Sequence, residues 1–161
     1  MTFFTGFFSP RRLILCFRLC ILSVMDDRDL LQAALKARQF ARAPYSGFSV
    51  GAALLCKSGR VYTGCNIESS SFGLSLCAER TALAKALSEG ESEFDRLAVV
   101  AEGSAPVKPC GACLQLLWDY APGLMLVLGN LDDQSERTSL ARLLPSPFSG
   151  SDLPGGVKRP V

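Results

Sequence analysis

The sequence predicts an α/β fold with three layers, α/β/α, around a mixed five-stranded sheet. Two strand-like apolar runs separated by a short polar turn are typical of a β-hairpin. After them, helical and strand-like segments alternate, as in sheets covered by helices on both faces. The chain has 161 residues, of which 48% are hydrophobic and 20% charged, which is sufficient for one domain with its own core.

The first helix is expected after Asp26 and Asp27, because acidic residues favour a helix N-terminus. Apolar residues then recur at helical spacing, and Pro44 is expected to end the helix. The residues that form this apolar face are Leu30, Leu31, Ala34, Leu35 and Ala41.

The hairpin and the alternating segments follow in order. Residues 48–56 and 61–66 are predicted as paired strands, with a turn between them and a loop at 69–73. Gly90 is a usual residue just past a helix end, so a helix is expected over residues 77–89. The later elements are expected to be a strand at 97–101, a helix at 110–120, a strand at 124–128, a short strand at 137–139 and a helical turn at 140–144.

The first 24 residues differ from the rest, because they contain five phenylalanines, three arginines and no acidic residue. We interpret residues 1–24 as a leader or an upstream extension outside the fold, with translation beginning at Met25 as the favoured interpretation. A secretory signal and an organelle leader are the alternatives. The domain is predicted over residues 25–153, and residues 154–161 are predicted to be a disordered tail.

Charge and residue usage narrow the function classes. A net charge of +2 is too small to argue for a nucleic-acid or membrane-surface partner, so neither is expected. The seven cysteines do not resemble a disulfide framework, which favours a reducing compartment and a cytoplasmic location. The chain contains no histidine, so a bound zinc would need sulfur or carboxylate ligands, and proton transfer would need another side chain.

Two cysteine motifs give the strongest functional signal, C-x-E at 77–79 and P-C-x-x-C at 109–113. Cys77, Cys110 and Cys113 can supply three thiolates to one Zn²⁺ and leave a fourth position for water. Glu79 is then placed as a general acid/base, as in the zinc deaminases. Both motifs begin expected helices that follow strands, so their N-termini can meet near one edge of the sheet and stabilise thiolates.

Two other interpretations of the C-x-x-C motif are open. A closed structural zinc site would need a fourth cysteine or histidine at metal-ligand spacing, and neither motif has one. A redox pair of the thioredoxin type would follow the first strand, whereas this motif comes late in the chain. The open catalytic site is therefore the favoured interpretation.

Together these motifs resemble the cytidine deaminases of the small, homotetrameric, all-cysteine zinc type, over residues 25–153. The resemblance also rests on P-Y-S-G-F at 44–48 with V-G-A at 50–52, G-C-N-I-E at 64–68, and L-L-P at 143–145 followed by Phe148. It implies zinc-dependent hydrolytic deamination of cytidine and 2′-deoxycytidine to uridine and 2′-deoxyuridine, in pyrimidine salvage. Nucleoside substrates and a homotetramer with shared active sites are the implied partners.

The resemblance also implies roles for individual residues. Zinc held by the three cysteines would activate the water that attacks C4 of the pyrimidine, while Glu79 moves protons to N3 and to the leaving amine. Arg80 is expected to donate to a thiolate, because a zinc with three thiolates carries a net negative charge. The substrate contacts implied are Asn66 and Glu68 to the ribose, Phe48 to the base, Ala78, and Phe148 from a neighbouring subunit, with Gln115 as a supporting residue.

Simpler interpretations of these residues are also open. Phe48 in an apolar strand would be core in most proteins, residues 66–68 would be a solvated turn, and Phe148 could cover a sheet edge. The chain also departs from the family pattern at two places. Leu114 stands where arginine is usual, which removes a cation that would offset thiolate charge, and Phe72-Gly73 stands where Tyr-Pro is common.

Three other functions compete with cytidine deamination. Blasticidin-type deaminases share the zinc motif and differ in substrate. Polynucleotide editors share the superfamily, but no basic segment with interleaved aromatic residues is evident in the sequence. A zinc-stabilised scaffold or a weakly active paralogue is the non-enzymatic alternative, and Leu114 is its only support.

Overall fold

Five strands form one mixed sheet in the computed structural model, which describes residues 25–157. The strand order is β2-β1-β3-β4-β5; β3 and β4 are parallel, and the other neighbouring pairs are antiparallel. The predicted fold class is confirmed. Residues 1–24 and 158–161, on which the predicted leader and the end of the predicted tail fall, lie outside the described residues. The strands are β1 (Val50–Cys56), β2 (Val61–Cys65), β3 (Phe94–Ala101), β4 (Met125–Gly129) and β5 (Ser135–Ser139).

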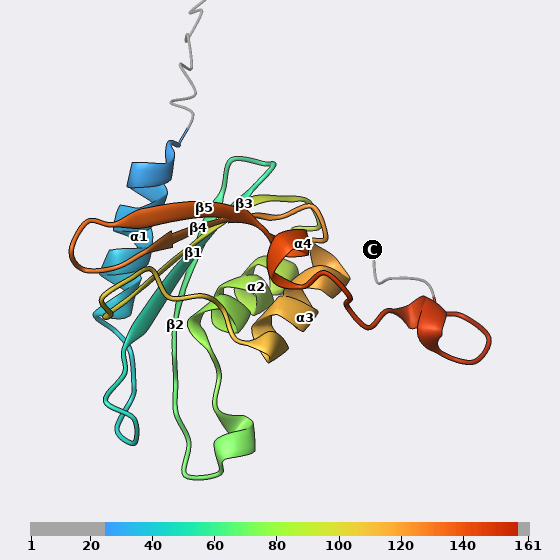
Figure 1. Ribbon diagram of the computed structural model, residues 1–161, viewed down its shortest axis with the longest axis horizontal. Helices are drawn as coiled ribbons and strands as arrows, with labels where there is room; N and C mark the ends of the chain where they lie inside the picture. Colours follow the sequence, from blue (N-terminus) through green and yellow to red (C-terminus); the bar gives the residue numbers. More distant parts are fainter. Residues whose placement is uncertain (1–24, 158–161) are drawn as a thin grey trace, which may run out of the picture.

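Helices cover both faces of the sheet (Figure 1). One face packs on α1 (Asp27–Arg38), and the other packs on α2 (Ala78–Ser88) and α3 (Gly111–Tyr120), beside the short α4 (Leu140–Leu143). β1 contributes to both layers of core, because side chains alternate along a strand. None of the helices in the described part of the chain is long and apolar enough to cross a membrane. Two short 3₁₀ helices complete the structure, η1 (Phe72–Leu74) and η2 (Gly150–Asp152).

Glycine at two strand positions allows the helices to approach the sheet closely. A Cβ at Gly51 would lie 2.0 Å from the carbonyl oxygen of Ala34 in α1. A Cβ at Gly64 would lie 2.4 Å from the carbonyl oxygen of Ala78, in the first turn of α2. Only glycine fits at such distances. Gly64 therefore fixes how closely the N-terminus of α2, where Cys77 lies, packs on β2.

The element boundaries differ from the predictions in two places that affect the site. α1 ends at Arg38, so the prediction that it continues to Pro44 is wrong. The reason is that Arg42 is extended and pairs with the chain after β2, where its N–H donates to the Asn66 carbonyl at 2.9 Å. Phe48 precedes β1 and is 39% exposed, so it is not a buried strand residue.

Other boundary predictions agree more closely with the structure. Gly90 follows α2 with φ +87°, which confirms its predicted place after the helix end. β3 begins at Phe94, before the predicted start of that strand. Residues 72–74 form η1, which overlaps the end of the loop expected at 69–73.

Candidate active site

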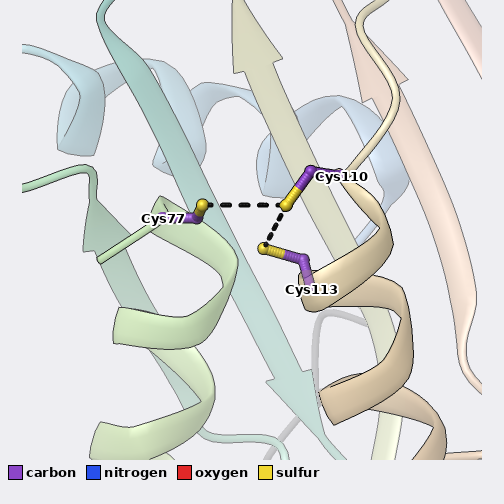
Figure 2. Close-up of side chains that lie close together, drawn as sticks. All are labelled: Cys77, Cys110 and Cys113. Atoms are coloured by element: carbon purple, nitrogen blue, oxygen red, sulfur yellow. Dashed lines mark hydrogen bonds between the residues drawn. The ribbon is translucent and has the colours of Figure 1, made fainter. Parts of the chain in front are cut away.

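Three cysteine sulfurs meet where the N-termini of α2 and α3 approach each other (Figure 2). Cys77 is the N-cap residue of α2, Cys110 is the N-cap residue of α3, and Cys113 lies in the first turn of α3. The Sγ atoms of Cys77 and Cys110 are 3.9 Å apart, and those of Cys110 and Cys113 are 3.6 Å apart. The structure therefore brings together the three residues proposed as metal ligands.

This spacing fits a zinc ion. Zinc–thiolate bonds of about 2.3 Å at tetrahedral angles place neighbouring sulfurs about 3.8 Å apart. All three sulfurs lie within 4.8 Å of one another, and the cluster contains no fourth cysteine, aspartate or glutamate among residues 25–157. Three ligands and one open position are typical of catalytic rather than structural zinc sites.

The surroundings of the cluster favour thiolates. Arg80 donates from Nη2 to the Ser75 carbonyl at 2.7 Å and to Cys77 Sγ at 3.8 Å. The hydrogen bond from Cys113, and then that from Arg80, lower the pKa of Cys77 to about 5 against the opposing effect of burial. The hydrogen bond to Cys77 and burial raise the pKa of Cys113. The positive ends of the two helices also favour negative charge here.

Glu79 lies in the first turn of α2 and is only 4% exposed. Burial raises the pKa of its carboxyl group, and the nearby charge of Cys77 raises the pKa further. A carboxyl group whose pKa lies above its usual range can both accept and donate a proton near neutral pH. The side chain of the neighbouring Ala78 is fully buried in the core, so a substrate contact by Ala78 would have to use its backbone.

Asn66 uses its side chain to hold the segment that leads into β1. Its Oδ1 accepts from the Val50 N–H at 2.8 Å, and its Nδ2 donates to the Phe48 carbonyl at 2.8 Å. An amide nitrogen carries two hydrogens, so one N–H of Asn66 is left for another acceptor. Asn66 and Phe48, both proposed to bind substrate, are thus held together by a direct hydrogen bond.

Glu68 holds the loop that precedes Phe48. Its Oε2 accepts from the Tyr45 N–H at 2.9 Å and the Ser46 N–H at 3.1 Å, and its Oε1 accepts from the Ser46 hydroxyl. The hydrogen bond from the Ser46 hydroxyl, followed by that from its N–H, lowers the pKa of Glu68. A cavity of about 330 Å³ opens here, lined by Tyr45, Ser46, Glu68, Phe72 and Ser75.

Gln115 and Phe148 form a separate pair. Phe148 lies on the segment after α4, which runs outward from the helical layer (Figure 1). Its side chain is 57% exposed. Gln115 Nε2 donates to the Phe148 carbonyl at 2.8 Å and to Asp119 at 3.2 Å. Gln115 therefore tethers the outward segment to α3.

Leu114 belongs to the core. It is 7% exposed and packs in the same cluster as Ala78, Ala82 and Leu117. The resemblance implied that an arginine at this position, which directly follows a cysteine proposed as a ligand, would offset thiolate charge. The structure gives it an apolar environment instead, because residues on this side of α3 face α2 and the sheet.

Sequence reasoning missed Ser46 and Ser75. The P-Y-S-G-F motif was recognised, but only Phe48 within it was given a role. Ser75 lines the cavity next to Glu68, and its carbonyl accepts from Arg80, which also contacts Cys77. Ser75 and Arg80 therefore connect the cavity to the metal cluster, and no motif in the sequence indicated this.

Comparison with known proteins decides the family. Residues 24–127 match the family described as the cytidine and deoxycytidylate deaminase zinc-binding region. The chain belongs to this family. A cytidine deaminase from Sporosarcina psychrophila is 50% identical over 130 residues, which cover 80% of this chain and 96% of that protein. A cytidine deaminase from Halalkalibacterium halodurans is 47% identical over 130 residues, which cover 80% of this chain and 98% of that protein.

A solved structure agrees with this assignment. The crystal structure of cytidine deaminase from Burkholderia pseudomallei is 47% identical, with a TM-score of 0.75. The match covers 77% of this chain and 100% of that one. The family resemblance drawn from the motifs is therefore confirmed.

Proposed function

We propose that this protein is a zinc-dependent enzyme that hydrolyses cytidine and 2′-deoxycytidine to uridine and 2′-deoxyuridine, releasing ammonia. The observation that carries the proposal is the open cluster of three thiolates beside the buried carboxyl group of Glu79. Membership of the deaminase family and relatives named cytidine deaminase support the substrate class.

Each residue of the metal side has a distinct task in this proposal. Cys77, Cys110 and Cys113 hold the zinc, which when bound supplies a Lewis acid that activates a water molecule. Glu79 accepts a proton from the attacking water and delivers protons to N3 and to the leaving amino group. Arg80 offsets the negative charge of the thiolates through its contact with Cys77.

The residues proposed to contact the nucleoside select the substrate. Asn66 and Glu68 hydrogen-bond the sugar hydroxyls, using the N–H and the acceptor positions that their contacts with residues 45–50 leave free. Phe48 stacks against the pyrimidine from its half-exposed position before β1. The backbone of Ala78 supplies a further contact at the start of α2.

We further propose a homotetramer in which Phe148 reaches the active site of a neighbouring subunit. Its exposed side chain and the outward course of its segment (Figure 1) support this role, and Gln115 holds that segment in place. A reducing compartment such as the cytoplasm would preserve the thiolates. Salvage of pyrimidine nucleosides is the process that such a reaction would serve.

The direct test follows ultraviolet absorbance of purified protein with cytidine, 2′-deoxycytidine, dCMP and cytosine. We expect turnover of the two nucleosides only, with one zinc per chain by elemental analysis. Turnover of cytosine or dCMP alone would assign another substrate class, and failure with every pyrimidine would leave the scaffold interpretation. Analytical ultracentrifugation of the same sample measures the oligomeric state.

A further inference from the structure

Two short segments beside the proposed sugar site are joined along their length. The Arg42 N–H donates to the Asn66 carbonyl at 2.9 Å, and the Glu68 N–H donates to the Arg42 carbonyl at 2.8 Å. The side chains of Asn66 and Glu68 then extend this pairing toward Phe48 and Ser46. The residues proposed to bind the sugar therefore also position the residue proposed to stack on the base.

One hydroxyl group connects the two functions. The Ser46 Oγ donates to Glu68 Oε1 and accepts from the Phe48 N–H at 3.0 Å. Ser46 also donates its own N–H to Glu68 Oε2 at 3.1 Å. The chain of contacts runs from the carboxylate of Glu68 through the Ser46 hydroxyl to the backbone of Phe48.

The turn that presents Ser46 has a fixed shape. Gly47 has φ +68°, in the left-handed region that favours glycine, and its N–H donates to the Ala43 carbonyl at 3.0 Å. This turn brings the Ser46 hydroxyl back toward the N–H of Phe48, two residues later. The contact is thus built into the local backbone and does not depend on a flexible side chain alone.

The hydrogen bonds to Glu68 also determine which acceptor position of its carboxylate remains for a ligand. The two oxygens of a carboxylate offer about four acceptor positions. Tyr45 and Ser46 occupy three of them with two N–H groups and one hydroxyl. The position that remains can accept from a sugar hydroxyl, and its direction is set by the donors on the other three.

We propose that Ser46 is a positioning residue for nucleoside recognition, which couples the orientation of Glu68 to the placement of Phe48. This inference rests on the proposed function and deepens it. Without the Ser46 hydroxyl, Glu68 keeps its two backbone donors but loses the contact that orients Oε1, and Phe48 loses the acceptor for its N–H. Binding of the sugar should suffer most, because Glu68 bonds the sugar directly.

The test compares Ser46→Ala and Ser46→Thr on cytidine and on 2′,3′-dideoxycytidine, which lacks the 2′- and 3′-hydroxyls of the sugar. Loss of a hydrogen bond to a charged group predicts that Ser46→Ala raises KM for cytidine about 10-fold. We expect kcat to change less than about threefold, because the chemical step uses Glu79 and the metal cluster. Ser46→Thr, which keeps a hydroxyl, should restore most of the loss.

Two controls separate positioning from general destabilisation. Ser58→Ala removes another serine–glutamate hydrogen bond, to Glu91 at 2.7 Å, at the opposite end of the β1–β2 hairpin, and should leave both KM values unchanged. In the double variant Ser46→Ala with Glu68→Gln, KM for cytidine should rise by less than the product of the two single rises, because the two residues act as one unit.

The outcomes distinguish the inference from the proposed function. The role of Ser46 would be overturned, and deamination left intact, by any of three results. These are equal rises in KM for cytidine and dideoxycytidine, no recovery of KM in Ser46→Thr, or a rise in KM in the double variant that equals the product of the two single rises. An inactive wild-type protein would overturn both. A larger loss on cytidine than on dideoxycytidine, with rescue by threonine, would support the coupling.

Discussion

The proposed metal side of the site (Cys77, Cys110, Cys113 and Glu79) and the proposed sugar side (Asn66, Glu68 and the loop before Phe48) are built in different ways. The metal side lies at two helix N-termini, where Cys113 is fully buried and Glu79 is 4% exposed, while Cys110, also part of the cluster, is exposed. The sugar side lies on loops, where Tyr45 is 56% exposed and Phe48 is 39% exposed. Proton transfer by the buried Glu79 requires fixed surroundings with little water, whereas a substrate must enter through accessible loops.

The largest effect should come from Glu79→Gln, which changes the metal side alone. Glutamine keeps the size of the side chain but cannot carry the proton, so kcat should fall by at least about 10³-fold, within the range for general acid–base catalysis. Zinc content and the midpoint of thermal unfolding should remain near wild type. Absorbance assays with cytidine and elemental analysis of zinc measure the two effects separately.

The matched control for this variant is Cys113→Ser, which removes a ligand and should lose both zinc and stability, because metal binding and folding are coupled. Loss of zinc in Glu79→Gln as well would contradict the assignment of Glu79 as a proton carrier. It would instead make Glu79 part of the metal-binding set.

The second effect concerns Leu114, the position at which the resemblance implies that arginine is usual. From the sequence, Leu114→Arg would be expected to raise activity by offsetting thiolate charge. Because Leu114 is 7% exposed within the apolar cluster around α2 and α3, the longer arginine side chain would disturb this apolar packing. We now expect a lower unfolding midpoint and no gain in kcat/KM at equal zinc occupancy. Leu114→Met, which keeps the volume and the apolar character, is the control.

A rise in kcat/KM for Leu114→Arg with unchanged stability would contradict this expectation. It would mean that the arginine side chain leaves the core and reaches the sulfurs along the surface of α3. The same measurement therefore shows whether the metal side depends on Arg80 and the helix ends alone.

The metal side could be predicted because its signal is local. Cys110 and Cys113 are three residues apart, which places them on the same face of a helix, and Cys77 with Glu79 begins another. Each thiol is a rare and chemically specific group. The short spacing within each motif was therefore sufficient to predict most of the arrangement of these side chains.

The sugar side could be predicted only in part. Glu68 bonds backbone N–H groups more than 20 residues away, and every residue except proline has such a group, so the sequence does not mark them. The end of α1 was mispredicted for the same reason. Arg42 leaves the helical path to pair with residues 66–68, a contact that periodicity within α1 does not encode.

A smaller effect should appear in the pH dependence of stability on the sugar side. Hydrogen bonds from Ser46 hold the pKa of Glu68 below its ordinary value of 4.5 in the folded protein. Such a group adds stability above its unfolded pKa, and this stability is lost as the pH falls through its folded pKa. The difference in unfolding midpoint between wild type and Glu68→Gln should therefore be constant above about pH 5 and shrink on further acidification.

Thermal unfolding followed by circular dichroism at several pH values measures this difference. Ser46→Ala should move the loss to higher pH, because the first cause of the lowered pKa is removed. A difference that grew as the pH fell would contradict the assigned direction of the pKa shift.

The smallest effect is expected from a chain that begins at Met25, which should leave both sides of the site unchanged. The start of α1 is anchored within the described residues, since Arg96 donates to the Met25 carbonyl at 2.6 Å and pairs with Asp27. The shortened chain keeps both contacts, so its unfolding midpoint should stay within about 2 °C of the full chain. Its kcat/KM should stay within about twofold, as for changes outside the core. Arg96→Ala, made in both chains, should lower both midpoints equally. The contrary result would be a shortened chain with a lower unfolding midpoint, in which Arg96→Ala lowers the midpoint less than it does in the full chain. That result would show that residues 1–24 pack on the domain near this arginine.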